Sequence, residues 1–401
     1  MYCVRNIKED IFYVGSDDRK ISKFENILDI HNGVSYNSYI IKDEKTCLLD
    51  TIDQSATKVF LENVEHVLNG RSLDYLVIHH MESDHCYNIN EIVLRYPDVT
   101  LVGNATTFKY LDQFFPNLKG KGKRLVVIDG FELVLGKHTL HFYLTPFVHW
   151  PEVMMSFDLK DKILFSADAF GTFSSLDGNL YNDDFEFEKD LLDEARLYYT
   201  NIVGKYGRQV QNAFKKLPVS EISMILPLHG PIWHNNLDVI LDKYQHWSTY
   251  TYEDKEVVIL YSSMYGNNEN VANILANYLS TKGVKHIKVY DVSVTEEAKL
   301  VSESFRVSNI VLIGSTYNGG LHPYMTNYIN GITNMGLSNR TFTLIDNGTW
   351  GPMAKKIMKE MLTKTPTFTF TNTELSVLSS LKEEDLAVLN TIADEVSSSL
   401  K

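Results

Sequence analysis

The sequence is poor in cysteine and has no long apolar run. Cysteine occurs three times, at Cys3, Cys47 and Cys86, and no CxxC pair is present. This argues against a disulfide framework and against a cysteine-ligated iron or zinc centre, and it favours a reducing cytoplasm. No run of 18 apolar residues occurs, and no apolar segment follows residues 1–6. We therefore expect neither a transmembrane helix nor a signal peptide.

An excess of positive charge is also missing. The 401 residues carry 38 Lys and Arg against 51 Asp and Glu, a formal net charge of −13. Nucleic-acid binding and docking on an anionic membrane both need clustered Lys and Arg, so we expect neither. The chain is 44% hydrophobic and 22% charged, which is typical of a globular protein. Its length indicates two or three domains.

Two sequence patterns meet in the polar, aromatic-rich stretch 243–256. The first part reads as short strands with interspersed helices, typical of layered mixed sheets. Its expected strands are 39–42, 47–50, 75–78, 125–128, 139–144, 154–158 and 163–166, with helices near 60–68 and 191–203. The second part alternates strands with helices and predicts a doubly wound parallel sheet. Its expected strands are 257–261, 286–290, 309–313 and 341–345, with a helix over 270–279.

Metal-competent side chains gather directly after the expected strand 75–78. His80, Glu82, Asp84 and His85 fall within six residues. In a tight loop alternate residues can turn toward one point, and His85 can reach a neighbouring point. The loop can therefore serve two metals. The adjacent His79 points opposite to His80 on a strand period, so we expect it to pack or to support the loop.

Three later residues are candidates to complete this site. His149, Asp168 and His229 each follow an apolar run and are flanked by Gly or Pro. Imidazole mixed with carboxylate, without a thiolate, favours iron or manganese over zinc, although affinity order alone does not select iron. The single histidines at 31, 138 and 141 are expected to be structural.

A second candidate site lies in the second part of the chain. The strand 257–261 runs into the polar loop 262–268 and then a helix, which makes an anion site at the helix N-terminus. No GxGxxG motif and no P-loop lysine occur, so a flavin monophosphate fits better than a dinucleotide, although a plain helix cap would look the same. Two further strand ends carry small residues beside Tyr317 or Trp350, which can pack on a flat ring. The predicted flavin-binding residues are Ser262, Ser263, Met264, Tyr265, Gly266, Asn267, Asn268, Ser315, Thr316, Tyr317, Asn318, Gly319, Asn347, Gly348, Thr349, Trp350 and Gly351.

The first motifs resemble those of the flavodiiron protein family, or A-type flavoproteins. They are His80-x-Glu82-x-Asp84-His85, His149-Trp150-Pro151, the stretch 166–171 and His229-Gly230-Pro231. The resemblance covers nearly the whole chain. It implies an α/β fold with an N-terminal metallo-β-lactamase-like αββα domain over residues 1–250. A flavodoxin-like doubly wound parallel sheet that binds FMN would follow over residues 251–401.

The resemblance also implies roles for individual residues. One iron would be held by His80, Glu82 and His149, and the other by Asp84, His85 and His229, with Asp168 bridging. Tyr198 resembles a family tyrosine near the site that can donate a proton or a hydrogen bond; a packed helix aromatic is its other interpretation.

This sequence departs from the family pattern at a few positions. The stretch 86–88 stands where a small residue and glycine are common, and His234 where arginine is common. Asn267 and Asn268 stand where Ser or Thr often contacts the phosphate. None of these departures removes a predicted metal ligand.

The implied activity is the four-electron reduction of O2 to two waters at a diiron centre, with electrons from FMN. The same residues allow reduction of NO to N2O. Two other readings are a dizinc hydrolase with a flavodoxin-like appendage and a flavin electron carrier with a vestigial metal domain. The implied partners are a rubredoxin or an NAD(P)H-dependent reductase as electron donor, and a second copy of the chain in a head-to-tail homodimer or a dimer of dimers.

Overall fold

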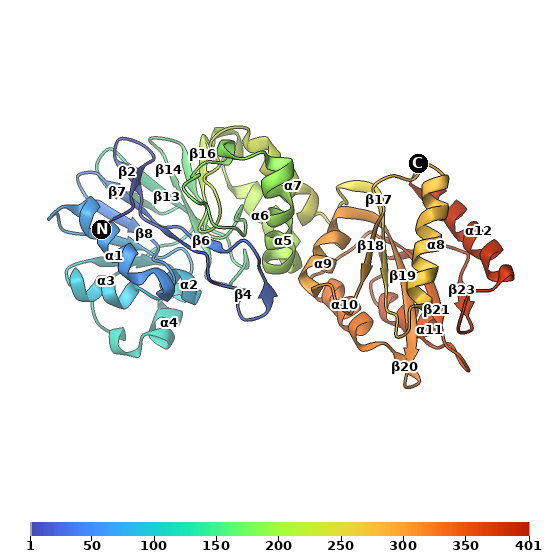
Figure 1. The fold of residues 1–401 in the computed structure, drawn as a ribbon. Helices are drawn as coiled ribbons and strands as arrows, with labels where there is room; N and C mark the ends of the chain where they lie inside the picture. Colours follow the sequence, from blue (N-terminus) through green and yellow to red (C-terminus); the bar gives the residue numbers. More distant parts are fainter. Residues whose placement is uncertain (1, 401) are drawn as a thin grey trace. The chain divides into compact units, whose positions relative to one another are not determined.

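The computed structural model describes residues 2–400 and divides the chain into two compact units after Tyr244 (Figure 1). The division lies within α7 (Leu237–Ser248), whereas the sequence suggested a boundary at residue 250. Across residues 2–400, no helix combines the length and the apolar character needed to cross a bilayer.

The first unit is built on two mixed sheets. One has the strand order β1 (Arg5–Asn6), β2 (Ile11–Tyr13), β7 (Tyr39–Lys42), β8 (Thr46–Leu49), β9 (Tyr75–Val77), β10 (Thr100–Gly103) and β11 (Lys123–Val126). The other has the order β12 (Glu132–Val134), β13 (Thr139–Leu144), β14 (Met154–Asp158), β15 (Ile163–Phe165) and β16 (Met224–Leu226). Two small ribbons pair β3 (Ser16–Asp18) with β6 (Val34–Tyr36) and β4 (Lys23–Phe24) with β5 (Leu28–Asp29).

The two sheets share one hydrophobic core because their strands bury alternate side chains. On β13, Leu140 and Phe142 are fully buried while their neighbours are partly exposed. They belong to the same cluster as Ile41 and Leu49 from the other sheet. The predicted hairpin is confirmed, with Tyr39 opposite Leu49 in the antiparallel pair β7–β8. Two sheets that interdigitate in this way form a sandwich.

Helices cover the outer faces of the sandwich and complete an αββα arrangement (Figure 1). Next to the first sheet lie α1 (Thr57–Leu68), α2 (Ser83–Cys86), α3 (Ile89–Arg95) and α4 (Ala105–Phe114). Next to the second lie α5 (Leu192–Tyr198), α6 (Gly207–Lys216) and α7. The helix α1 ends at Leu68, because the next residue, Asn69, has a left-handed backbone (φ 45°) that cannot continue the helix.

The helix expected over residues 191–203 changes its winding in the middle. The α-helical part ends at Tyr198, and Tyr199–Val203 continue as a π-helical turn. Both tyrosines are fully buried: the Tyr198 ring lies 5.5 Å from that of His229, and the Tyr199 ring lies 4.9 Å from that of Tyr244. These two consecutive large aromatics thus pack on different partners, at a π-helical turn of the kind that is frequent near functional sites.

The second unit contains the predicted doubly wound parallel sheet. Its parallel strands follow the order β18 (Lys288–Asp291), β17 (Asp254–Tyr261), β19 (Val307–Tyr317), β21 (Thr341–Asn347) and β22 (Thr369–Phe370), with β23 (Leu375–Val377) also paired to β21 and β20 (Gly320–Leu321) to β19. One face carries α8 (Asn267–Thr281) and α12 (Glu383–Ser399), and the other carries α9 (Glu297–Arg306), α10 (Pro323–Asn334) and α11 (Ala354–Leu362) (Figure 1). The strand order reverses between β17 and β19, so a crevice for a ligand is expected at their carboxyl ends.

Candidate metal centre and flavin site

The loop after β9 is held in place by a buried carboxylate. Asp50 Oδ1 accepts hydrogen bonds from the main-chain N–H groups of His79 (2.7 Å) and His80 (3.3 Å). The other oxygen of Asp50 lies 2.6 Å from His79 Nδ1, and His79 Nε2 lies 2.8 Å from Ser156 Oγ. The imidazole of His79 is thus committed to Asp50 and Ser156. It supports the loop, as its strand position indicated.

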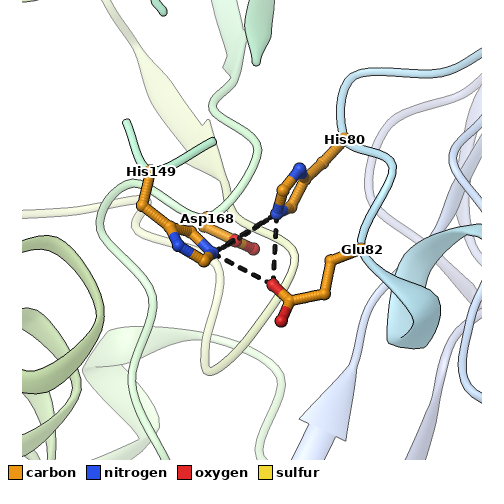
Figure 2. A group of neighbouring side chains, drawn as sticks. All are labelled: His80, Glu82, His149 and Asp168. Carbon is orange, nitrogen blue, oxygen red and sulfur yellow. Dashed lines mark hydrogen bonds and ion pairs between the residues drawn. The ribbon is translucent and has the colours of Figure 1, made fainter. Parts of the chain in front are cut away.

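Four of the predicted ligands converge on one point. His80, Glu82, His149 and Asp168 point toward a common centre from three separate segments (Figure 2). Glu82 Oε2 lies 3.2 Å from His80 Nε2 and 3.0 Å from His149 Nε2. Asp168 Oδ2 lies 3.2 Å and 3.0 Å from the same two nitrogens. All donor atoms of this group lie within 4.8 Å of one another.

The remaining predicted ligands form a second group beside the first. Asp84, His85 and His229 also have donor atoms within 4.8 Å of one another. Asp84 Oδ2 lies 3.3 Å from both His85 Nε2 and His229 Nε2. Asp168 joins the two groups, because its Oδ1 lies 3.1 Å from His85 Nε2 while its Oδ2 faces the first group. His85, whose role depended on the resemblance, is turned inward at His229, with 3.1 Å between their Nε2 atoms.

Glycines let the strand ends bring Asp168 and His229 into the site. Gly230 has a left-handed backbone (φ 76°), and a Cβ on it would lie 2.2 Å from Thr172 Oγ1. A Cβ on Gly171 would lie 3.0 Å from both the Asp168 carbonyl oxygen and a ring carbon of Tyr198. The flanking glycines noted in the sequence are therefore required by close approach of the backbone.

The cluster concentrates negative charge out of contact with water. Burial raises the pKa of Asp168, but the neighbouring His80 and His85 bring that pKa well below its usual range. Burial lowers the pKa of His149, but Asp168 and Glu82 raise it to about 9. The imidazoles beside Asp168 thus favour the charged form of this carboxylate, and Asp168 and Glu82 favour the protonated form of His149.

The donor atoms fit two divalent metal ions. Both oxygens of Asp84 and Oδ1 of Asp168 are buried without a hydrogen bond. A buried carboxylate oxygen without a partner is costly unless a cation compensates it. Each of the two groups offers imidazole nitrogen and carboxylate oxygen, a donor set that iron, manganese and zinc accept. One cation at each group would compensate the carboxylate oxygens that lack hydrogen bonds.

Aromatic side chains wall the second group. The rings of Phe24, Tyr36 and Tyr198 lie 5.6, 5.7 and 5.5 Å from that of His229. Tyr198 is fully buried, and burial raises the pKa of its hydroxyl well above the ordinary value. That hydroxyl therefore stays protonated at neutral pH and is available as a donor.

Several residues of this region escaped the sequence reasoning. Asp50 holds the loop, and Glu152 lies 2.8 Å from His80 Nδ1. Glu25 lies exposed at the tip of the β4–β5 ribbon, where partial desolvation of its carboxyl group and the neighbouring Glu82 raise its pKa. Asp50 had a signal, since it is a carboxylate at the end of a strand expected beside the metal loop. Glu25 had none.

The positions that depart from the family pattern lie outside both metal groups. Asn88 anchors its loop by donating to the main-chain oxygen of Ile52 at 2.7 Å. His234 lies on the surface side, 3.4 Å from Asp183 and with its ring 5.2 Å from that of Tyr181. Neither residue belongs to the clustered donor atoms.

The predicted flavin loops surround a cavity of about 360 Å³ at the carboxyl ends of β17, β19 and β21. All the predicted residues line it except Ser262 and Gly266. Ser262 is fully buried and receives the Ser315 N–H on its Oγ at 3.1 Å. Ser379, which the sequence reasoning missed, also lines the cavity, because β23 runs beside β21 and places the following loop there.

The cavity has the features that a flavin phosphate and ring require. The helix α8 begins at Asn267 without a side-chain cap, so its first N–H groups are available to an anion. The amide oxygen of Asn268 is buried without a hydrogen bond. Trp350 is 95% exposed and Tyr317 is 44% exposed at the edge of the cavity, where each offers a face to a flat ring.

Comparison with known proteins points to one family. A family model described as ODP family beta lactamase matches residues 34–230. The anaerobic nitric oxide reductase flavorubredoxin of Klebsiella pneumoniae is 27% identical over 351 residues, which are 86% of this chain and 71% of that protein. The structure of rubredoxin oxygen:oxidoreductase from Desulfovibrio gigas aligns with a TM-score of 0.92 and 26% identity over 99% of this chain and 98% of that one. The flavodiiron protein of Giardia intestinalis shares the fold, with a TM-score of 0.90 and 21% identity over 99% and 97% of the two chains.

Proposed function

Because the chain belongs to the flavodiiron protein family, we propose that it is an oxidoreductase that reduces O2 to water at a diiron centre with electrons from FMN. The observation that carries the proposal is the pair of donor groups joined by Asp168, with buried carboxylate oxygens that lack hydrogen bonds. The cavity lined by the predicted flavin loops in the same chain supplies the reason for a redox metal.

Seven residues would hold the two irons. His80, Glu82 and His149 would bind one, Asp84, His85 and His229 the other, and Asp168 would bridge them. His85 is included because its Nε2 lies among the donor atoms of the second group. The metal domain would span residues 1–250 and the flavin domain residues 251–401.

Side chains of this protein would prepare the reaction around the bound groups. When bound, the irons and FMN together supply the four electrons that O2 needs to form two waters. The carboxylates limit the charge on the metal pair, and the protonated hydroxyl of Tyr198 would donate a hydrogen bond or a proton to the oxygen substrate. Phe24 and Tyr36 exclude bulk water beside His229. In the flavin cavity, the α8 N-terminus would bind the phosphate, and Tyr317 or Trp350 would pack on the ring.

Nitric oxide is the second candidate substrate, because the Klebsiella relative is named a nitric oxide reductase. The same ligand set would bind either gas. Rates for O2 and NO, measured with one preparation of reduced protein, would decide between them, and a much faster NO reaction would overturn the O2 preference.

A dizinc hydrolase is distinguished by metal analysis of protein purified without chelator. Stoichiometric zinc without iron would overturn the redox proposal.

Electrons would come from a separate protein, either a rubredoxin or an NAD(P)H-dependent reductase. The Desulfovibrio relative is named for rubredoxin, and this sequence has no CxxC pair of its own. A head-to-tail homodimer, or a dimer of dimers, would bring the flavin of one copy to the metals of the other. Tyr265 and Trp350 are large aromatic side chains exposed in the single chain, and a second copy that covered them would bury this apolar surface. Three free cysteines support a cytoplasmic location.

Anaerobic titration of the fully reduced protein with O2 tests the main proposal. Flavin oxidation and peroxide are followed together. Complete oxidation without peroxide is expected of water formation. Abundant peroxide would identify a leaky flavin oxidase instead.

A further inference from the structure

Three of the four imidazoles in the two metal groups, those of His80, His229 and His85, differ in what their Nδ1 atoms contact. His80 Nδ1 lies 2.8 Å from Glu152 Oε1, a carboxylate oxygen. His229 Nδ1 lies 2.8 Å from the main-chain oxygen of Ser35, a neutral acceptor. His85 Nδ1 is buried without a hydrogen bond. Among these three rings, only that of His80 therefore has a carboxylate hydrogen-bonded to its Nδ1.

Glu152 is anchored through one carboxylate oxygen, Oε1, while its Oε2 is buried without a hydrogen bond. Its side chain is fully buried, and Oε1 also accepts the main-chain N–H of Met81 at 2.8 Å. Its own carbonyl oxygen accepts the side-chain amide of Asn104 at 2.6 Å. Asn104 is itself fixed, because it caps the start of α4 through Thr106 and Thr107. The carboxylate is thus held between the metal loop and the His80 ring.

The hydrogen bond to Glu152 determines which ring nitrogen of His80 carries the proton and which is free to bind a metal. Because Oε1 already accepts from Met81, it acts as an acceptor toward His80, whose Nδ1 then carries the proton. The lone pair is left on Nε2, which lies 3.2 Å from both Glu82 and Asp168. A carboxylate behind a metal-binding imidazole fixes its orientation and strengthens it as a donor.

We propose that Glu152 is a positioning residue that makes the two metal positions inequivalent. The inference rests on the proposed diiron function. A stronger donor with a negative charge behind it stabilises ferric over ferrous iron, so the iron at His80, Glu82 and His149 has the lower reduction potential. The iron at His85 and His229, which lack a carboxylate behind their rings, has the higher one. The first iron is thus the last of the pair to be reduced.

The Glu152→Gln variant of the full-length, iron-loaded protein tests this assignment. Glutamine keeps the acceptor oxygen and nearly the same size but removes the charge. The two one-electron potentials of the iron pair are measured by redox titration, with the mixed-valent state followed by electron paramagnetic resonance. The lower potential is expected to rise by ~59 mV for each tenfold loss of ferric preference, while the higher one stays in place. Iron affinity is expected to fall about 10- to 100-fold.

A matched control exists in the same unit. Asp158 and His138 form another fully buried carboxylate–imidazole pair at 3.0 Å, at the opposite end of β14 from the metal loop. Asp158→Asn removes the same charge and is expected to lower stability without moving either potential. Glu152→Asp keeps the charge and should hold the potentials closer to those of the unaltered protein than Glu152→Gln does, which covers the case in which the glutamine variant folds poorly.

The outcomes separate the two proposals. A smaller difference between the two iron reduction potentials in Glu152→Gln, with both potentials unchanged in Asp158→Asn, supports the assignment. Equal shifts of both potentials, no shift, or the same shift in the control overturns it while leaving the diiron function intact. Failure of the unaltered protein to bind two irons per chain overturns both.

Discussion

The metal centre and the flavin cavity are built in contrasting ways. The candidate metal centre brings together seven side chains, six of them buried, from the loops and the short helix α2 at the edge of the sandwich core. The flavin cavity is a cup of loops at one sheet edge, with Tyr265 and Trp350 more than nine-tenths exposed at its edge. The first site depends on the identity of each side chain, whereas the second depends mainly on the path of the backbone. Substitutions should therefore act differently at the two sites.

The largest effect is expected at the residue shared by both metal groups. Asp168→Asn removes the carboxylate whose two oxygens face the two groups. Loss of one bridging charge should weaken both positions, with iron content well below two per chain and O2 reduction lowered at least about 100-fold. Iron analysis and oxygen consumption measure the two effects. The exposed Asp177→Asn is the control, and an Asp168→Asn protein that keeps two irons would refute the bridging role.

Glycine substitutions compare the two sites directly. Gly230→Ala adds a Cβ 2.2 Å from Thr172 Oγ1 at a left-handed backbone position, so it should cost about 2–4 kcal/mol of unfolding free energy and displace His229. Gly351→Ala lies in a flavin loop where no atom is within 4 Å of the added Cβ. Its expected cost is below about 0.5 kcal/mol, with FMN binding retained. Chemical denaturation measures both, and similar costs would erase the contrast between the sites.

An exposed aromatic should affect the flavin alone. Trp350 is 95% exposed, so Trp350→Ala removes little packing from the flavin-free protein. Loss of stacking on the flavin ring is worth about 0.5–1.5 kcal/mol, which weakens FMN binding up to about tenfold. Fluorescence titration with FMN gives the affinity, and iron content serves as the internal control. Unchanged FMN affinity would remove Trp350 from the predicted contacts.

The smallest expected effects concern pH, and they have opposite signs in the two units. In the metal unit, burial lowers the pKa of His138, but Asp158 and Asp10 raise it above the ordinary value. The ion pairs of protonated His138 therefore stabilise the fold. This stabilisation is complete below the ordinary pKa of about 6.5 and is lost as pH rises through the raised pKa. In the flavin unit, burial raises the pKa of Glu303, but Arg306 and Lys288 lower it. That contribution is present above the ordinary pKa and is lost as pH falls through the lowered one.

Calorimetry across the pH range checks these signs. His138→Gln should flatten the alkaline slope of stability, and Glu303→Gln should flatten the acid slope. If His138→Gln changes the acid slope of stability against pH, or Glu303→Gln changes the alkaline slope, the assignment of these slopes to the two residues is wrong.

Local patterns in the sequence were sufficient for much of the fold. The β7–β8 hairpin followed from two short apolar runs, and the parallel sheet from regular strand–helix alternation. The cluster His80-x-Glu82-x-Asp84-His85 predicted a metal loop because its donors are close in sequence. Its assignment as metal ligands remains a prediction, although the structure brings these side chains together with His149, Asp168 and His229.

Contacts between distant segments could not be predicted in the same way. Glu152 reaches His80 across 72 positions because the end of β9 and the loop before β14 meet in the sandwich. Ser379 enters the flavin cavity because β23 pairs with β21. Tyr199, in the π-helical turn, packs against Tyr244, which lies 45 positions away. Periodicity and spacing carry no information on such tertiary pairings.

The origin of the residues at each site has a consequence for inheritance. Every donor atom of the metal centre comes from residues 80–229, and every residue that lines the flavin cavity comes from residues 263–379. Each could therefore be exchanged as a block by recombination, or decay by mutation, without changing the chemistry that the other encodes.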